Sequence, residues 1–131
     1  MLAQAWLRLG DESLTAAEGL RKAGHWRSSV SRSYYAAYSF LAAALILQPA
    51  VTFKSDRHGP EHEGLSELIA NHLRTALARS LRSQVRIGIT ALYQRRLTAD
   101  YRPLSSVIKE TAVVALKEAT MIAKIIKDIT A

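Results

Sequence analysis

The sequence predicts an all-α protein, an up-and-down bundle of four long helices with one additional short helix. Apolar residues recur at intervals of three and four over several long segments, and no segment alternates for long enough to form a strand. The chain has 131 residues, of which 49% are hydrophobic, so it is long enough to bury one core. We therefore expect a single domain over residues 1–131.

The first two helices are expected to follow each other closely. Residues 2–22 predict an amphipathic helix that ends near Gly24, because glycine commonly terminates helices. Residues 28–47 predict a second helix, which is apolar almost all round and hence buried. The expected inner face of the first helix consists of Leu7, Leu14, Ala17 and Leu20.

Three further helices are expected after a loop at residues 48–60, which holds two prolines and a glycine. Residues 61–73 predict a short helix, residues 75–100 a long one that ends before Pro103, and residues 106–129 the last. The expected apolar stripe of the long helix is Leu77, Leu81, Val85, Gly88 and Leu92. The expected inner positions of the last helix are Val113, Leu116, Thr120, Ala123, Ile126 and Ile129.

Composition excludes several classes of function. The chain has no cysteine, which excludes disulfides, thiolate nucleophiles and thiolate metal sites and fits a reducing compartment. Its longest apolar run, residues 34–47, is shorter than the roughly 20 residues that a membrane-spanning helix needs. No secretory signal and no glycine-rich phosphate loop is visible. We expect a cytoplasmic protein with no cofactor and no membrane partner.

Positive charge is concentrated in one segment. The formal net charge is +7, and residues 71–102 hold seven arginines and one acid, a net charge of +6. This concentration suggests an anionic partner, such as nucleic acid or an acidic protein surface. Arg79, Arg82 and Arg86 share one helix face with Tyr93, and arginine combined with tyrosine suits phosphate contact and base stacking. The alternative is an ordinary solvated helix surface.

One turn of the second helix is unusually rich in large polar side chains. Arg32, Tyr34, Tyr35 and Tyr38 stand in an otherwise apolar stretch. Buried hydroxyls and guanidinium groups need partners, because an unpaired polar group in a core costs free energy. The helix therefore carries a satisfied polar network or borders a cleft. It is also so apolar that we expect a second copy of the chain to cover it in a homodimer.

Two histidines have the four-residue spacing of helical metal ligands. His58 and His62 are accompanied by Glu61 and Glu63, but a Gly-Pro pair between the histidines interrupts any helix. We therefore expect no metal site. The remaining alternatives are a solvated loop and a His62 that begins the short helix and points to a cleft.

Two adjacent arginines in the long helix differ in what they require. Arg95 falls on the Leu92 side of the helix, where a guanidinium needs a carboxylate, backbone carbonyls or a water-filled pocket. Arg96 and Asp100 have the spacing of a helical ion pair, in the arginine-first order that stabilises a helix less. A functional pair and a purely structural pair both fit this spacing.

Four short motifs occur in order along the chain: AGHW at residues 23–26, SRSYYAAY at 31–38, EHEGL at 61–65 and LYQRRLTADY at 92–101. Together they resemble a HEPN domain of the small stand-alone prokaryotic kind. The first motif resembles the Ala-Gly-x-aromatic step of that family, and the second resembles its Arg-x-Tyr-Tyr-Ala-x-Phe signature. Residues 61–65, EHEGL, resemble its Thr-His-x-Gly-Val motif. Residues 92–101, LYQRRLTADY, resemble its Leu-Tyr-x-x-Arg-x-x-Ala-Asp-Tyr segment. The resemblance covers nearly the whole chain.

The resemblance implies a helical bundle that usually forms a dimer. Many members are metal-independent ribonucleases with an Arg-x(4–6)-His motif, and many are toxins encoded beside a minimal nucleotidyltransferase that neutralises them. Arg96 matches the family arginine, but Leu97 follows it where Asn is common, and no histidine lies downstream. Tyr101 stands in the place of the histidine. A tyrosine hydroxyl, with a pKa of about 10, exchanges protons less readily than imidazole near neutral pH.

We expect a HEPN-like module, related to toxin–antitoxin or defence systems, that binds a nucleotide, RNA or a minimal nucleotidyltransferase. Two alternatives stay open. The first is an active metal-independent endoribonuclease toxin, in which Arg96 stabilises the phosphorane charge and His62 or Tyr101 moves the proton. The second is a non-enzymatic dimeric interaction or assembly domain. The expected ligand site comprises Arg32, Tyr35, His62, Arg96, Asp100 and Tyr101.

Overall fold

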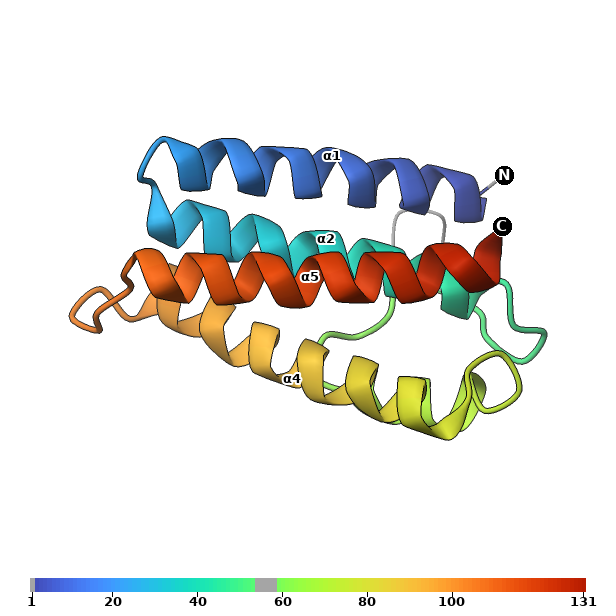
Figure 1. The fold of residues 1–131 in the computed structure, drawn as a ribbon. Helices are drawn as coiled ribbons and strands as arrows, with labels where there is room; N and C mark the ends of the chain where they lie inside the picture. The colour runs from blue at the N-terminus through green and yellow to red at the C-terminus, as the bar shows by residue number, and fades with distance from the viewer. Residues whose placement is uncertain (1, 54–58) are drawn as a thin grey trace.

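Five α-helices make up the computed structural model, which describes residues 2–53 and 59–131 and contains no strand within them. The helices are α1 (Leu2–Lys22), α2 (Trp26–Ile46), α3 (Leu65–His72), α4 (Arg79–Tyr101) and α5 (Lys109–Thr130). The four long helices alternate in direction along the chain (Figure 1). The predicted all-α bundle of four long helices and one short helix is confirmed.

The tight link between α1 and α2 depends on Gly24, whose φ of 81° is a conformation that side chains disfavour. The Gly24 N–H donates to the Arg21 carbonyl at 3.1 Å, and the His25 N–H donates to the Leu20 carbonyl at 2.9 Å. These bonds satisfy carbonyls that the end of α1 would otherwise leave unpaired. The predicted stop at Gly24 therefore has a clear physical basis.

α2 lies at the centre of the bundle and contacts each of the other helices. From Tyr34 to Leu45 every side chain except that of Tyr35 is buried within this one chain. The reason for expecting a homodimer, that one bundle is too small to cover α2, is therefore wrong, because α1, α3, α4 and α5 already cover it. A homodimer itself stays a prediction. Among the described residues, no helix has the length and hydropathy that crossing a membrane requires.

α3 and α4 both begin later than the sequence predicts. The short helix expected at 61–73 begins at Leu65, and the long helix expected at 75–100 begins at Arg79. Leu77 is buried but precedes α4, and Leu81 is 36% exposed, so Leu81 does not belong to the buried stripe. The N-terminal end of α4 diverges from α5 (Figure 1), and this agrees with the exposure of Leu81, which lies in the first turn of α4.

The inner face of α5 also differs from the prediction. Thr120 is exposed, and Val113 and Leu116 are only half-buried. Small alanines occupy much of the buried face, and they carry too little hydrophobic signal to reveal it from the sequence, although they allow α2 and α5 to pack closely. The buried residues of α5 are Ala112, Ala115, Ala119, Ile122, Ala123, Ile125 and Ile126.

Candidate functional site

Polar side chains from α2 and from the end of α4 converge on Arg96. Nη2 of Arg96 donates to Tyr35 Oη at 2.8 Å and to Tyr101 Oη at 3.4 Å. Its Nε lies 3.0 Å from Asp100 Oδ2, an ion pair in which the N–H is poorly aligned for a hydrogen bond. Ser31 Oγ donates to the same carboxylate oxygen at 3.2 Å. The predicted Arg96–Asp100 pair therefore forms within α4, and hydrogen bonds to Tyr35 and Ser31 connect the pair to α2.

Three tyrosine rings surround the guanidinium group of Arg96, which lies close to the protein surface and carries a positive charge. Its carbon lies 5.9 Å, 5.4 Å and 5.2 Å from the ring centroids of Tyr34, Tyr35 and Tyr101, within the range of cation–π attraction. Burial by itself lowers the pKa of Arg96, but the Tyr35 and Tyr101 hydroxyls and the Asp100 carboxylate outweigh burial and raise it. Arg96 therefore remains charged, with a side chain that is 14% exposed.

Arg32 and Tyr101 form the exposed rim of this arrangement. The Arg32 guanidinium carbon lies 6.0 Å from the Tyr35 ring centroid, and Tyr101 is 65% exposed. We call Arg32, Tyr35, Arg96, Asp100 and Tyr101 the Arg96 cluster. The structure thus brings together five of the six residues expected to bind a ligand, and their binding role stays a prediction.

His62, the sixth residue, precedes α3 and packs among the tyrosines of α2. Its ring stacks on Tyr38, with centroids 4.4 Å apart and planes inclined at 22°. Its Nδ1 lies 2.5 Å from Tyr34 Oη. Tyr38 Oη donates to the Pro60 carbonyl at 2.6 Å, which fixes the segment just before His62. The buried tyrosines therefore form the satisfied polar network that the sequence left open as one alternative.

The protonation states within this network follow from burial. Burial raises the pKa of Tyr34 well above its ordinary value and raises that of Tyr38 to about 12. Burial also lowers the pKa of His62, with help from the positive charge of Arg96, and together they outweigh the opposite influence of Glu61. His62 is therefore neutral at pH 7. We assign the Tyr34 hydroxyl as the donor to Nδ1, which leaves the hydrogen of the imidazole on Nε2.

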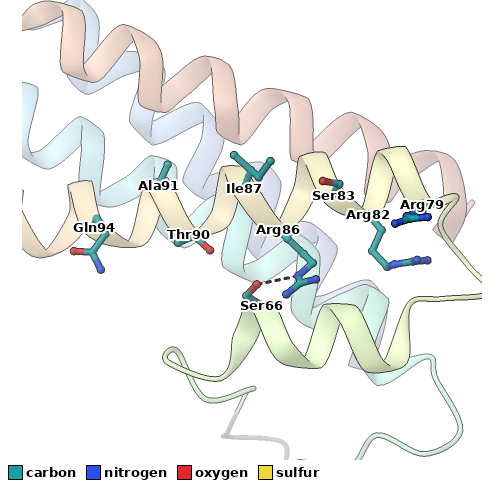
Figure 2. A pocket seen from close by; sticks show the side chains of 9 residues that line it. All are labelled: Ser66, Arg79, Arg82, Ser83, Arg86, Ile87, Thr90, Ala91 and Gln94. Carbon is teal, nitrogen blue, oxygen red and sulfur yellow. Dashed lines mark hydrogen bonds between the residues drawn. The ribbon is translucent and has the colours of Figure 1, made fainter.

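A groove of about 650 Å³ runs along the outer side of α4, where Ser66 of α3 faces it. Arg79, Arg82 and Arg86 line this groove together, as their spacing predicts (Figure 2). Arg86 Nε donates to Ser66 Oγ at 3.1 Å, and Arg82 Nη1 donates to the Leu77 carbonyl at 3.0 Å. Two of the three guanidinium groups are thus held in place at the groove wall.

A second hollow of about 240 Å³ continues the groove toward His62. The two spaces share Ser66, Thr90 and Gln94 as lining residues, so they adjoin each other, and we call the two together the α3–α4 groove. Tyr93 lines the second hollow, and its ring is nearly parallel to that of His62, with centroids 6.4 Å apart. The groove therefore leads from arginines at one end to His62, which contacts the tyrosines beside Arg96.

Two arginines outside the predicted site connect α4 with neighbouring helices. Arg27 of α2 donates to five backbone carbonyls around that end, those of Thr98, Ala99, Arg102, Pro103 and Ser105. Sequence reasoning missed Arg27, because main-chain acceptors more than 70 residues away leave no side-chain pattern. Arg95, which was predicted to need a partner, forms an ion pair with Glu118 of α5.

The paired-histidine pattern is described only in part. His58 lies outside the described residues, so the structure gives no account of it. Within the described part of the chain, no group of three histidine, cysteine, aspartate or glutamate side chains is arranged to hold a metal ion.

A solved structure shares this fold over almost its full length. The crystal structure of TT1696 from Thermus thermophilus matches with a TM-score of 0.74 and covers 97% of each chain. Sequence identity is 16%, so the likeness establishes the fold alone. No curated protein shows a significant sequence match to the chain.

The family assignment comes from the sequence as a whole. The model of the HEPN domain matches residues 3–129, nearly the entire chain. This match agrees with the four short motifs quoted above, which now lie on α2, α4 and the segments that lead into α2 and α3. HEPN domains are modules connected with nucleotides or RNA, and they often dimerise. The chain belongs to the HEPN domain family.

Proposed function

We propose that this protein binds RNA along the α3–α4 groove and the Arg96 cluster, and that it does so without cleaving it. The observation that carries the proposal is that the two adjoining spaces of the groove lie between a row of arginines and His62. Arg79, Arg82 and Arg86 line one end, and the other end reaches His62 beside the tyrosines that surround Arg96. A backbone of phosphates matches a row of arginines, and unpaired bases match aromatic rings.

Arginine suits this role because its planar guanidinium can contact two phosphate oxygens at once. Arg86 already donates a hydrogen bond to Ser66, and Arg82 donates one to the Leu77 carbonyl. These bonds fix the two side chains, so less conformational entropy is lost when a ligand binds. Arg96 adds a cation that burial and tyrosine rings keep in position. These features favour binding through phosphates over an ordinary solvated surface.

Cleavage is not part of the main proposal, because none of the described side chains of the groove and the Arg96 cluster is an evident general base. The basic nitrogen of neutral His62 is engaged by the Tyr34 hydroxyl. Tyr101, which stands where the family histidine is expected, contacts Arg96 but is a phenol rather than an imidazole. A role in a toxin–antitoxin or defence system, and a nucleotidyltransferase as partner, stay predictions from the resemblance.

Binding of a labelled single-stranded RNA, followed by fluorescence anisotropy at several salt concentrations, tests the proposal. We expect the affinity of the wild type to fall steeply with salt. The double variant Arg82→Ala/Arg86→Ala should bind more weakly, and its salt slope should be shallower by about 0.7 for each phosphate that the variant no longer neutralises.

A matched control removes the same amount of charge elsewhere. Arg8 and Lys124 are exposed on α1 and α5 and do not line the groove. The variant Arg8→Ala/Lys124→Ala should therefore bind RNA nearly as the wild type does. Equal losses in the two double variants would mean that binding depends on net charge alone, and the proposed site would be wrong.

One observation favours an active ribonuclease as the second candidate. His62 is neutral, which is the form a general base requires, and it shares Tyr34 as a neighbour with the charged Arg96. A substrate that displaced the Tyr34 hydroxyl would release Nδ1 to accept a proton. Incubation of labelled RNA with the protein and excess chelator separates the two candidates. Cleavage by the wild type that is lost in Arg96→Ala would establish the enzyme and overturn the non-cleaving proposal.

A further inference from the structure

We propose that the α3–α4 groove selects single-stranded RNA that carries a guanine, with the base in the hollow beside Glu63 and the neighbouring phosphates on Arg86 and Arg82. This inference rests on the proposed function and adds to it the type of strand and the identity of one base. Four observations support it, and they concern the charge, size, chemistry and spacing of the groove.

The charge of the groove changes sign along its length. The larger space is lined by Arg79, Arg82 and Arg86, whereas the smaller space is lined by Glu63 and, among the residues that the structure describes, by no arginine or lysine. A carboxylate repels a phosphate and accepts hydrogen bonds from N–H groups. The smaller space is therefore suited to the base of a nucleotide, and the larger space to its phosphates.

The smaller space has the size of one nucleobase. An engineered cavity of about 150 Å³ holds a benzene molecule, so the 240 Å³ beside Glu63 can hold a two-ring purine. Its apolar walls are formed by Leu65, Ile89 and the ring of Tyr93. Such a wall provides the flat apolar contact on which a base stacks.

The chemistry of the polar wall favours guanine among the four bases. Guanine alone has two adjacent N–H donors on its Watson–Crick edge, N1–H and the N2 amino group, and one carboxylate can accept from both. Adenine and cytosine offer the carboxylate a single amino group, and uracil a single imino N–H. Gln94 and Thr90 also line this space and can bond the remaining polar atoms of the base.

The spacing along α4 fits an extended single strand. Arg82, Arg86 and Thr90 succeed one another at intervals of four residues, a rise of about 6 Å per step. Successive units of an extended strand can therefore meet successive turns of the helix. A base can enter the hollow with its Watson–Crick edge toward Glu63 only if that edge is unpaired, so a duplex is excluded.

Short single-stranded RNAs that differ at one central position test this inference. The position carries guanine, adenine, cytosine, uracil or inosine, which keeps N1–H but lacks the N2 amino group, and binding is measured at one fixed salt concentration. We expect guanine to bind about tenfold more tightly than adenine or uracil, with inosine in between. Pairing the guanine strand with its complement should abolish this preference.

Two variants of α3 and its leading segment provide a matched comparison. Glu63→Gln removes one carboxylate from the hollow, and Glu67→Gln removes one from an exposed position of α3 that does not line the groove. We expect Glu63→Gln to lose the preference for guanine while it keeps salt-dependent binding. Glu67→Gln should keep both properties.

The outcomes distinguish this inference from the function on which it rests. If the wild type binds all five RNAs equally, and binding still requires Arg82 and Arg86, the base-selective hollow is wrong but the RNA-binding function stands. A guanine preference that survives in Glu63→Gln also overturns the inference. If no RNA binds in a salt-dependent manner, both proposals fail together.

Discussion

Replacement of Arg27 by methionine should destabilise the fold by removing a guanidinium that holds the end of α4. Arg27 Nη1 donates to the carbonyls of Thr98, Ala99 and Arg102 at distances of 3.0 to 3.1 Å, and Nη2 serves two further carbonyls. The C-terminal end of a helix leaves its last carbonyls without helical partners and carries partial negative charge. A guanidinium at this position donates hydrogen bonds to these carbonyls and balances the partial negative charge.

The size of the effect can be worked out from these contacts. A hydrogen bond from a charged donor contributes about 1.5–3 kcal/mol, but the five bonds share one group and are not additive. Bonds to exposed carbonyls are replaced by water in the variant and count for little. We therefore expect a loss of about 2 kcal/mol in the free energy of unfolding, which is a fall in Tm of about 6–10 °C for a chain of this size.

Thermal unfolding followed by circular dichroism measures this loss, and Arg102→Met is the matched control. Arg102 lies at the same end of α4, is exposed, and contacts only Thr98 Oγ1 at 3.3 Å through its side chain among the described hydrogen bonds. Its replacement should change stability by no more than about 0.5 kcal/mol. If Arg27→Met unfolds at the same temperature as this control, the carbonyls do not depend on Arg27 and the reasoning is wrong.

Two further predictions concern glycines of α1 and the pH dependence of stability. A Cβ on Gly10 would lie 2.9 Å from the buried ring of Phe40, so Gly10→Ala should destabilise by about 1–3 kcal/mol in denaturant unfolding. A Cβ on Gly19 meets nothing within 4 Å, so Gly19→Ala should stabilise α1 by about 0.5–1 kcal/mol. Because the pKa of His62 is lowered on folding, the folded protein should lose stability as pH falls below about 6.5, and His62→Gln should lose less.

The sign of the pH effect follows from where the proton binds more tightly. Burial lowers the pKa of His62 in the folded state, so the unfolded state takes up the proton first as pH decreases. The contribution of His62 is complete above the unfolded pKa and is lost as pH falls toward the folded pKa. An NMR titration in which His62 protonates above pH 6.5 would contradict this prediction. Equal stability of Gly10→Ala and Gly19→Ala would contradict the prediction for α1.

The tyrosine network of α2 shows how far physical reasoning from the sequence could reach. Tyr34 and Tyr38 stand in an apolar helix, and the cost of an unpaired hydroxyl predicts that each has a partner. The structure supplies His62 and the Pro60 carbonyl. The partners themselves could not be predicted from spacing, because they lie on a segment more than 20 residues away.

Features that depend on weak or main-chain signals escaped prediction. The buried face of α5 is rich in alanine, which gives a weak hydrophobic signal. Val113 and Thr120, on a neighbouring face, were therefore predicted to be buried instead. The acceptors of Arg27 are main-chain carbonyls, which every type of residue carries, so no sequence pattern indicates them. The Arg96 cluster was expected because short motifs of α2 and α4 resemble one family, and local spacing alone would have indicated only the Arg96–Asp100 pair.

Chemical-shift mapping of the wild-type protein with a short single-stranded RNA locates the surface on which the RNA binds. We expect perturbations along α3 and α4, at Ser66, Arg86, Thr90 and Gln94, that continue to His62. Perturbations confined to the opposite face, where α1 and α5 lie side by side (Figure 1), would contradict this expectation.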